Sequence, residues 1–294
     1  MSKPLPHSDG LPQRPDWLQR VTVIGVGLLG GSLGLSLRRN GVYVKGCCRS
    51  DSSCNDAIQF GTVDEASTDI ASACRDSQIV VIAAPVTKIA ELAVAAKPHL
   101  QEGAIITDVG STKTRILNEI RTLTPDLGSR FVAAHPIAGS EKSGCQNASA
   151  TLFDQKTIVL TPDAENDDRS VGRAEEFWLQ TGGRVVHMSA EDHDQRLACV
   201  SHVPHLIASA LTLLPEESSH VLVGSGWADM TRVASGDPEL WTAICEHNRS
   251  PILQQLDRLM AELVELRGRV EQAETGSLRT WLADAKRIKD QVGD

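Results

Sequence analysis

The first two-thirds of the chain alternate short apolar runs with segments of helical spacing. The apolar runs are rich in β-branched residues and end at turn-forming residues, which predicts strands. They read VTVIG (21–25), VYVKGCC (42–48), QIVVIAAP (78–85), AIITDVG (104–110), RFVAAHP (130–136), KTIVLTP (156–162) and GGRVVHM (182–188). Apolar strands separated by helices indicate a parallel sheet covered on both faces.

After Met188 the strand pattern stops and the remaining chain has helical spacing. Residues 190–214 predict one long helix interrupted only by Pro204, and from Leu197 onward it is apolar almost all the way round. Such a helix belongs in a deep interior or an oligomer interface. We therefore expect an α/β protein with a mobile, Pro-rich tail over residues 1–18, a sheet domain over 19–187 and an all-helical domain over 188–294.

Composition and charge narrow the class of partner. Hydrophobic residues make up 41% of the chain and charged residues 23%, as in an ordinary globular protein. The net charge of -9 argues against nucleic acid or an anionic membrane as the main partner, because both need clustered Lys and Arg. Seven cysteines without C-x-x-C spacing, and no signal-peptide or membrane-spanning run, predict a cytoplasmic protein with reduced thiols.

Five glycines crowd residues 21–34, directly after the first predicted strand. Gly25, Gly27 and Gly30 form G-x-G-x-x-G where the strand ends and a helix opens at Leu28 and Leu29. In that setting the first glycine makes a tight turn, the second lets a pyrophosphate approach, and the third permits close helix–strand packing. The motif predicts a Rossmann-like dinucleotide site, the alternative being a tight turn with no ligand.

The choice of dinucleotide depends on the end of the second strand. An acidic residue there binds the ribose 2′-hydroxyl of NAD, whereas this chain has Arg49 followed by Ser50. An arginine can pair with a 2′-phosphate, so NADP is favoured over NAD, unless Arg49 is simply a solvent-exposed loop residue. Pro85 and Val86, where a later strand ends, are expected to line the same cofactor.

Two candidate catalytic side chains lie at later strand ends, where open α/β sheets bind their ligands. His135 follows the apolar run FVAA, and Ser111 lies in DVGSTK (108–113). A lone histidine is often structural. A hydroxyl beside it favours a catalytic role, because the pair can orient a substrate hydroxyl and its proton.

The helical domain adds polar candidates. His202 and His205 are three residues apart and can share a helical face. With His193 they could resemble metal ligands, but no carboxylate or cysteine pattern completes such a site, so we expect no metal. Packing, or contact with a substrate carboxylate, is favoured instead. Arg232, in a segment flanked by two aspartates, fits a buried ion pair or an anion clamp equally well.

Together these segments resemble a known family. VTVIGVGLLGGSLGLSL, DVGSTK, HPIAGSEKSG, SHVPH and TRVASGDPELW are similar to motifs of the prephenate/arogenate dehydrogenases of tyrosine biosynthesis, over about residue 20 to beyond 250. The resemblance implies a nucleotide-binding domain followed by a helical dimerisation domain, and an NAD(P)-dependent oxidative decarboxylation of a cyclohexadienol. It also implies a homodimer.

The resemblance further implies roles for particular residues. His135 would receive the proton of the ring hydroxyl, Ser111 would hold that hydroxyl and His135 in place, and Arg232 would bind a substrate carboxylate. The remaining motif positions would line or support the pocket; they are Glu141, His202, His205 and Trp241.

Two other functions stay open from the sequence. The β-hydroxyacid dehydrogenases share the two-domain plan but use a lysine in G-x-x-G-x-x-K-x-x-x-N, which this sequence lacks. A non-catalytic dinucleotide sensor is the other, and the presence of His135 together with Ser111 favours the enzyme. The sequence does not distinguish prephenate from arogenate, which differ in a keto or amino group remote from the reacting hydroxyl.

Overall fold

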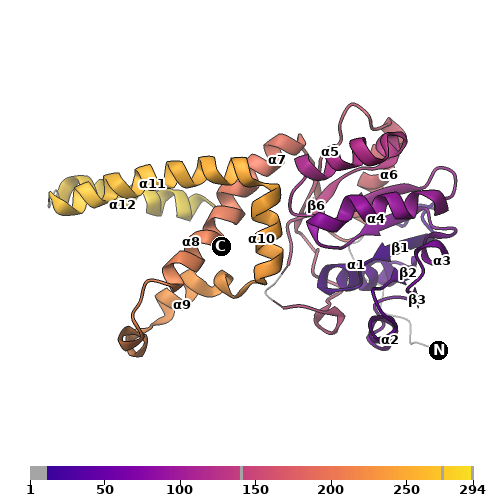
Figure 1. Ribbon diagram of the computed structural model, residues 1–294, viewed down its shortest axis with the longest axis horizontal. Helices are drawn as coiled ribbons and strands as arrows, with labels where there is room; N and C mark the ends of the chain where they lie inside the picture. Colours follow the sequence, from indigo (N-terminus) through magenta and orange to yellow (C-terminus); the bar gives the residue numbers. More distant parts are fainter. Residues whose placement is uncertain (1–11, 140–141, 273–274, 293–294) are drawn as a thin grey trace.

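The computed structural model describes residues 12–139, 142–272 and 275–292. Figure 1 shows a layered α/β region at one end of the molecule and an extended helical region at the other. The helical region has two arms, one made by α11 and α12 and the other by α8 and α9. The structure therefore confirms the predicted order of an α/β part followed by an α-helical part.

In the described residues, the main sheet has five parallel strands in the order β3-β2-β1-β4-β5. Val21 of the central strand is in register with Val44 on one side and with Ile79 on the other. All four residues of β4 are buried, because helices cover both faces of the sheet. The strands are β1 (Arg20–Ile24), β2 (Tyr43–Cys47), β3 (Glu65–Ser67), β4 (Ile79–Ile82) and β5 (Ile105–Asp108).

Each face of this sheet packs into its own hydrophobic cluster. Leu33 and Leu37 of α1 lie in one cluster with Trp178 of α6, and Ile89 of α4 lies in the other with Ile116 of α5. This two-sided burial is the reason the strand sequences are continuously apolar. The helices are α1 (Leu28–Arg39), α2 (Asp51–Gln59), α3 (Ile70–Cys74), α4 (Ile89–Ala96), α5 (Thr114–Leu123) and α6 (Asp168–Leu179).

The last three predicted strands depart from the expected parallel sheet. They form a second sheet of β6 (Ala134–Pro136), β7 (Thr157–Leu160) and β8 (Arg184–His187), in which β6 and β7 are antiparallel. A parallel pair needs a crossover, usually a helix, whereas the described residues between β6 and β7 contain only the short turn η4 (Cys145–Asn147). The prediction of a single parallel sheet was therefore wrong for these strands.

The N-terminal segment is partly packed. Leu18, which the sequence placed in a mobile tail, is completely buried in the core, and the indole of Trp17 donates a hydrogen bond to Glu176. The guanidinium of Arg173 also lies over the Trp17 ring. These two residues therefore belong to the folded part of the chain, and the predicted tail does not extend to them.

The second part of the chain is helical, as predicted. Its first long helix consists of α7, a π-helical turn η5, and α8. Pro204 lies in the first turn of α8, where its missing N–H costs least. The elements are α7 (Ala190–Leu197), η5 (Ala198–His202), α8 (Val203–Thr212), α9 (Ser225–Thr231), η7 (Arg232–Ser235), α10 (Pro238–His247), α11 (Arg249–Glu271) and α12 (Thr275–Val292).

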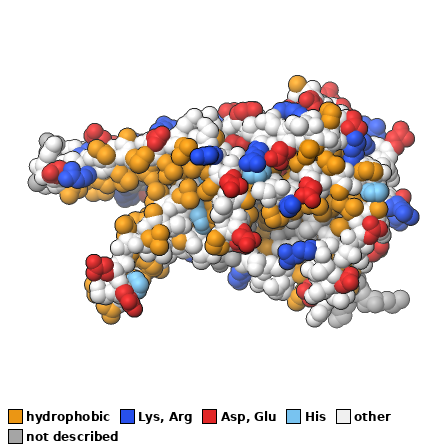
Figure 2. Space-filling view, in the orientation of Figure 1, with side chains coloured by type: hydrophobic (Ala, Val, Ile, Leu, Met, Phe, Trp, Pro, Cys, Tyr) orange, Lys and Arg blue, Asp and Glu red, His pale blue; other side chains and the backbone are white. Residues whose placement is uncertain are grey.

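This helical part buries few of its apolar side chains. One small cluster holds Ala198, Val203 and Ile252, while Leu213 and Val264 are 84% and 69% exposed. Figure 2 shows apolar side chains gathered along both arms of the helical region. An apolar surface of this kind marks an interaction site. Among the described residues, no helix is long and apolar enough to cross a membrane.

Candidate active site

The glycine loop forms an open cradle at the carboxyl edge of the main sheet. Gly25 has φ +94°, and a side chain there would collide with the carbonyl of Ala83. A side chain at Gly30 would collide with the Gly25 carbonyl, whereas one at Gly27 would meet nothing within 4 Å. Helix α1 begins without a side-chain cap, so its first N–H groups face this space. The cradle therefore fits a dinucleotide pyrophosphate at a helix N-terminus.

The other predicted cofactor residues lie around the same edge. Arg49 is exposed directly beyond β2, and within the described residues it makes no hydrogen bond or ion pair. The Ser50 hydroxyl accepts a hydrogen bond from the Ser53 N–H and caps α2. After β4, Pro85 is exposed and Val86 is buried at the start of the turn η1 (Val86–Lys88). Their contacts with a cofactor stay predictions.

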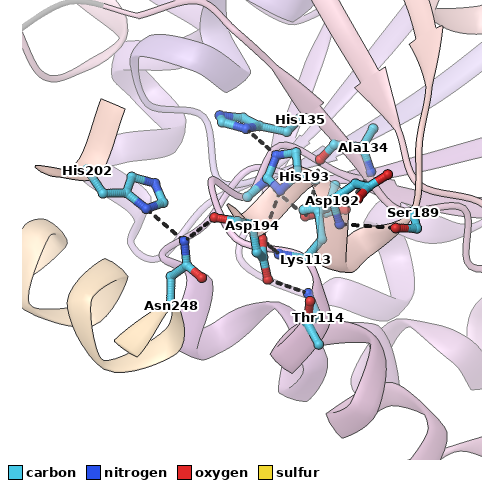
Figure 3. Close-up of polar contacts among 12 residues, drawn as sticks. Lys113, Thr114, Ala134, His135, Ser189, Asp192, His193, Asp194, His202 and Asn248 are labelled. Carbon is cyan, nitrogen blue, oxygen red and sulfur yellow. Dashed lines mark hydrogen bonds and ion pairs between the residues drawn. The ribbon is translucent and has the colours of Figure 1, made fainter. Parts of the chain in front are cut away.

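His135 lies on β6, close to the carboxyl end of β5. The N–H of its neighbour Ala134 donates to Asp108 Oδ1 over 2.9 Å, which ties β6 to that strand end. The His135 side chain is partly exposed and meets the ring of His193 edge-on, with 2.9 Å between His135 Nδ1 and His193 Nε2 (Figure 3). Burial, with His193 and Lys113 nearby, holds the pKa of His135 well below its ordinary value.

His193 is in turn bound to the carboxylate that follows it in sequence. Its Nδ1 lies 2.8 Å from Asp194 Oδ1, and both side chains are buried at the start of the helical part. The Asp194 carboxylate also accepts the main-chain N–H groups of Lys113 and Thr114, at 2.8 and 2.9 Å. Asp194 therefore holds α7 against the N-terminus of α5.

Opposing effects set the pKa values of this pair. Burial alone would raise the pKa of Asp194, but hydrogen bonds from His193 and Thr114 outweigh it, so the pKa is lowered. For His193, burial lowers the pKa, and the hydrogen bond to Asp194 only partly offsets this. The pair is therefore an ionised carboxylate beside a neutral imidazole at neutral pH.

A buried ion pair supports the strand ends beneath the histidines. Lys113 and Asp108 are both completely buried and form an ion pair, and Lys113 Nζ also donates to the Ala134 carbonyl over 2.7 Å. Asp108 accepts further hydrogen bonds from the N–H groups of Gly110 and Ala134. Because every polar atom of the pair has a partner, the backbone that carries His135 is firmly held.

Ser111 is placed near this network but not within it. It lies partly exposed in the loop between Asp108 and Lys113. Within the described residues, its hydroxyl makes no hydrogen bond, and the ring partner of His135 is His193. The predicted contact of Ser111 with His135 is therefore not seen, and its role toward a substrate hydroxyl stays a prediction.

His202 brings a second ring to the site from the helical part. The Asn248 amide donates to His202 Nδ1 over 3.0 Å and to the Asp194 main-chain carbonyl over 2.7 Å. His202 is 1% exposed, and its Nε2 has no hydrogen-bond partner among the described residues. Burial lowers the pKa of His202 to about 4. A neutral ring bonded in this way keeps its proton on Nε2, which is therefore a buried donor without an acceptor.

The remaining predicted substrate residues lie further along the helical part. His205 stacks on Trp241 with ring centroids 3.5 Å apart, and Gly236 packs closely against both rings. Arg232 is exposed at the start of the segment that leads to Gly236. The structure thus brings Arg232, His205 and Trp241 into one region, beside a groove of about 550 Å³ that His205 and Trp241 help to line. Glu141 lies outside the described residues.

The helical part covers the cofactor edge of the sheet. Helix α10 packs against η1, and Ala243 of α10 packs against the cluster that holds Val86 and Ile89. Among the described residues, no group of three or more His, Cys, Asp or Glu side chains is placed to hold a metal ion, and the absence of a metal stays a prediction. The candidate site therefore lies where the two parts of the chain meet.

Sequence reasoning missed several residues of this site. Asp194 and Asn248 carried no prediction, Lys113 was noticed only as the last residue of DVGSTK, and His193 only as a possible metal ligand. The one available signal was the adjacent His193–Asp194 pair in a helix that is otherwise apolar further on. Its partner His135 is 58 residues away in sequence, so no local pattern could have joined them.

A glycine cradle at the carboxyl end of β1 and a neutral histidine tied to the carboxyl end of β5 are features typical of a dinucleotide-dependent oxidoreductase. Comparison with known families agrees. Residues 33–187 match the model of the prephenate dehydrogenase nucleotide-binding domain, and residues 189–284 match that of the prephenate dehydrogenase dimerization domain. The chain belongs to the prephenate dehydrogenase family.

Individual relatives cover nearly the whole chain. Prephenate dehydrogenase of Bacillus subtilis (strain 168) is 31% identical over 279 residues, which is 92% of this chain and 75% of that protein. The structure of Aquifex aeolicus prephenate dehydrogenase in complex with hydroxyphenyl propionate and NAD+ has a TM-score of 0.86 at 30% identity, covering 94% of this chain and 98% of that one. Synechocystis arogenate dehydrogenase has a TM-score of 0.80 at 29% identity, covering 94% and 100%.

Proposed function

We propose that this protein oxidises and decarboxylates prephenate or arogenate, giving 4-hydroxyphenylpyruvate or tyrosine. The observation that carries the proposal is His135, a neutral histidine whose Nδ1 is engaged by His193 at the carboxyl edge of the sheet, where the glycine cradle also opens. Family membership supplies the substrate class. Two relatives with solved structures, one a prephenate and one an arogenate dehydrogenase, match this chain over 94% of its length.

In this proposal His135 is the general base. Its lowered pKa keeps the ring neutral at physiological pH, so Nε2 can accept the proton of the ring hydroxyl without first losing one of its own. The glycine cradle would hold NAD(P)+, which would supply the hydride acceptor for the ring carbon that bears this hydroxyl. Loss of carbon dioxide then makes the ring aromatic, which renders the reaction effectively irreversible.

Other side chains of the chain hold the substrate. Arg232 binds a substrate carboxylate, and Ser111 holds the reacting hydroxyl. His202 donates a hydrogen bond from its buried, unpartnered Nε2–H to a substrate oxygen. This bond would remove the free-energy penalty of a buried donor that has no acceptor. The stacked pair of His205 and Trp241 supports the wall beside them. We assign Glu141 to the same pocket from its motif position.

The cofactor is NADP rather than NAD in this proposal. The support is Arg49, an exposed cation just beyond β2 where NAD-binding sheets carry an acid. Gly27 and the first turn of α1, with Leu28 and Leu29, would hold the pyrophosphate, and Ser50, Pro85 and Val86 would border the nucleotide.

We further propose a cytoplasmic homodimer. The match to a family dimerization domain and the exposed apolar side chains of α8, α9, α11 and α12 support the dimer. All seven cysteines lie in described residues and none forms a disulfide, which supports a reducing compartment.

A crossed steady-state assay tests the function. Purified protein is given prephenate or arogenate, each with NAD+ or NADP+, and reduced cofactor and product are measured. We expect turnover of at least one cyclohexadienol with release of carbon dioxide, and a higher kcat/KM with NADP+. Tight cofactor binding without turnover of either substrate would refute the enzyme and favour a dinucleotide sensor.

A further inference from the structure

We propose that His193 and Asp194 are positioning residues that fix the proton of His135 on Nδ1 and so keep Nε2 bare toward the substrate. The inference deepens the proposed function, because it names what prepares the base for its reaction. It rests on an unbroken chain of two contacts, 2.8 Å from Asp194 to His193 and 2.9 Å from His193 to His135 (Figure 3).

The donor and acceptor of each of these two hydrogen bonds are fixed, because the series begins at the Asp194 carboxylate, which can only accept a hydrogen bond. The Asp194 carboxylate receives main-chain N–H groups from Lys113 and Thr114 at the N-terminus of α5. A carboxylate held by two N–H donors and a helix N-terminus is ionised and has no proton to donate. The proton between Asp194 and His193 therefore belongs to His193 Nδ1.

That assignment determines the rest of the chain. A neutral His193 with its proton on Nδ1 has a lone pair on Nε2, which can only accept. His135 Nδ1 must then be the donor across the 2.9 Å contact, and His135 Nε2 is left with the lone pair. The neutral histidine side chain in water prefers the opposite form, with the proton on Nε2. The buried pair thus imposes the form that the reaction needs, as a buried carboxylate does for a catalytic histidine elsewhere.

The hydrogen-bonded series of His135, His193 and Asp194 joins the two parts of the chain. His135 lies on β6 of the α/β part, whereas His193 and Asp194 lie on α7 of the helical part. Asn248, the residue between α10 and α11, bonds the Asp194 carbonyl and His202 and so ties the start of α11 to the same point. The protonation of the base therefore depends on α7 being docked on α5.

Nitrogen-15 NMR of the free enzyme, labelled at histidine, tests the inference directly. The ring nitrogen shifts and couplings show which nitrogen carries the proton, and the spectrum of His135→Asn assigns the His135 signals. We expect wild-type His135 to be protonated at Nδ1 and bare at Nε2 at pH 7.5. A wild-type ring protonated at Nε2 would overturn the inference.

Variants of His193 supply the kinetic test. His193→Phe keeps a ring of similar shape but no acceptor, and should move the His135 proton to Nε2 and lower kcat about 10–100-fold with KM changed less than about threefold. His193→Gln, whose amide oxygen can accept from His135, should recover part of the lost kcat. His247→Phe is the control, because it also replaces a buried imidazole but lies outside the chain of contacts. Its His135 signals should match wild type.

The outcomes separate this inference from the proposed function. Wild-type kcat in His193→Phe, or no recovery in His193→Gln, would overturn the positioning role. Full activity in His135→Asn would overturn His135 as the base, whatever the NMR shows. Because the protonation is read in the free enzyme, it is decided even if His193→Phe fails to fold.

Discussion

The two parts of this molecule differ in how many of their apolar side chains are buried and how many of their buried polar groups are hydrogen-bonded. In the α/β part, two large clusters bury both faces of the main sheet, and even the buried Lys113 and Asp108 have all their partners. In the helical part, ring nitrogens of His202, His205 and His247 are buried without hydrogen-bond partners among the described residues. Among its described residues, α12 has no buried residue and α11 has only Ile252.

This difference suits the α/β part to a scaffold role and the helical part to binding other molecules. Buried polar groups in proteins are normally hydrogen-bonded, and large apolar patches are normally covered. The α/β part follows these rules more closely, although Arg39 Nε, Thr112 Oγ1 and Thr161 Oγ1 are buried there without partners among the described residues. The helical part leaves several ring nitrogens unpartnered and many apolar side chains exposed, and we propose that substrate meets His202 and that a second subunit covers the apolar faces.

The largest predicted effect is a loss of activity caused by a substitution in the α/β part. His135→Asn keeps some hydrogen bonding but removes the base, so kcat should fall about 10²–10⁴-fold with little change in KM. Steady-state kinetics measure this once cofactor binding and folding of the variant match wild type. Turnover at the wild-type rate would show that the base lies elsewhere.

Acid should destabilise the protein through its buried histidines. Their pKa values are lowered in the folded state, so as pH falls below about 6.5 the unfolded chain binds protons first and stability is lost. His202, with a pKa of about 4, should alone cost about 3 kcal/mol between pH 6.5 and 4.

Urea unfolding at several pH values measures this loss. His202→Gln should reduce the pH dependence of the unfolding free energy, and His220→Gln, at an exposed position, is the matched control. An unchanged slope in His202→Gln would mean that this ring does not titrate on unfolding.

Substrate binding by the helical part should appear in KM. Arg232 is proposed to bind a carboxylate already present in the ground state, through a charge-assisted contact of roughly 1.5–3 kcal/mol. Arg232→Gln should therefore raise KM about 10–100-fold at modest cost in kcat. A wild-type KM in a correctly folded variant would remove Arg232 from the site.

The next prediction tests whether a second subunit covers the exposed apolar side chains of the helical part. Leu263 is 51% exposed on the apolar side of α11, and Leu263→Glu would place a charge in the proposed interface. We expect the dimer dissociation constant to rise at least about tenfold, as measured by sedimentation at micromolar concentrations. Gln254→Glu adds the same charge to an exposed polar position of α11 and should leave the dimer intact. A wild-type protein that is monomeric throughout would refute the proposed dimer.

The smallest effect should be on cofactor choice. Arg49→Ala should raise KM for NADP+ about tenfold, since one exposed charge pair is lost, while KM for NAD+ changes little. Arg75→Ala, another exposed arginine of the α/β part, is the control. Equal changes for both cofactors would show that Arg49 does not read the 2′-phosphate.

Much of this architecture was predictable because its signals are local. Continuous apolar runs marked the strands, and Gly25, Gly27 and Gly30 marked the cradle by spacing alone. The short edge strand β3 was not predicted, since its residues Glu65–Ser67 have no apolar pattern. The antiparallel pairing of β6 with β7 also left no trace in the hydrophobic pattern, which does not encode strand direction.

The site was harder to predict than the fold. His135 could be found because it follows an apolar run at a strand end, but what activates it could not. The pairing of His135 with His193 joins a strand to a helix of the other part, and the Asp194 contact with the N-terminus of α5 depends on how those parts dock. Such contacts arise only from tertiary packing, which periodicity along one segment does not report.

The π-turn η5 gives the first helix of the helical part a strict length requirement. His193 and His202 are nine residues apart, which in a regular α-helix of 3.6 residues per turn places them on opposite sides. The wider turn at Ala198–His202 reduces that rotation, and Asn248 can then bond to the Asp194 carbonyl and to His202 together. In evolutionary terms, the constraint is on the number of residues between His193 and His202. Inserting or deleting a single codon between them would turn one histidine away from the other.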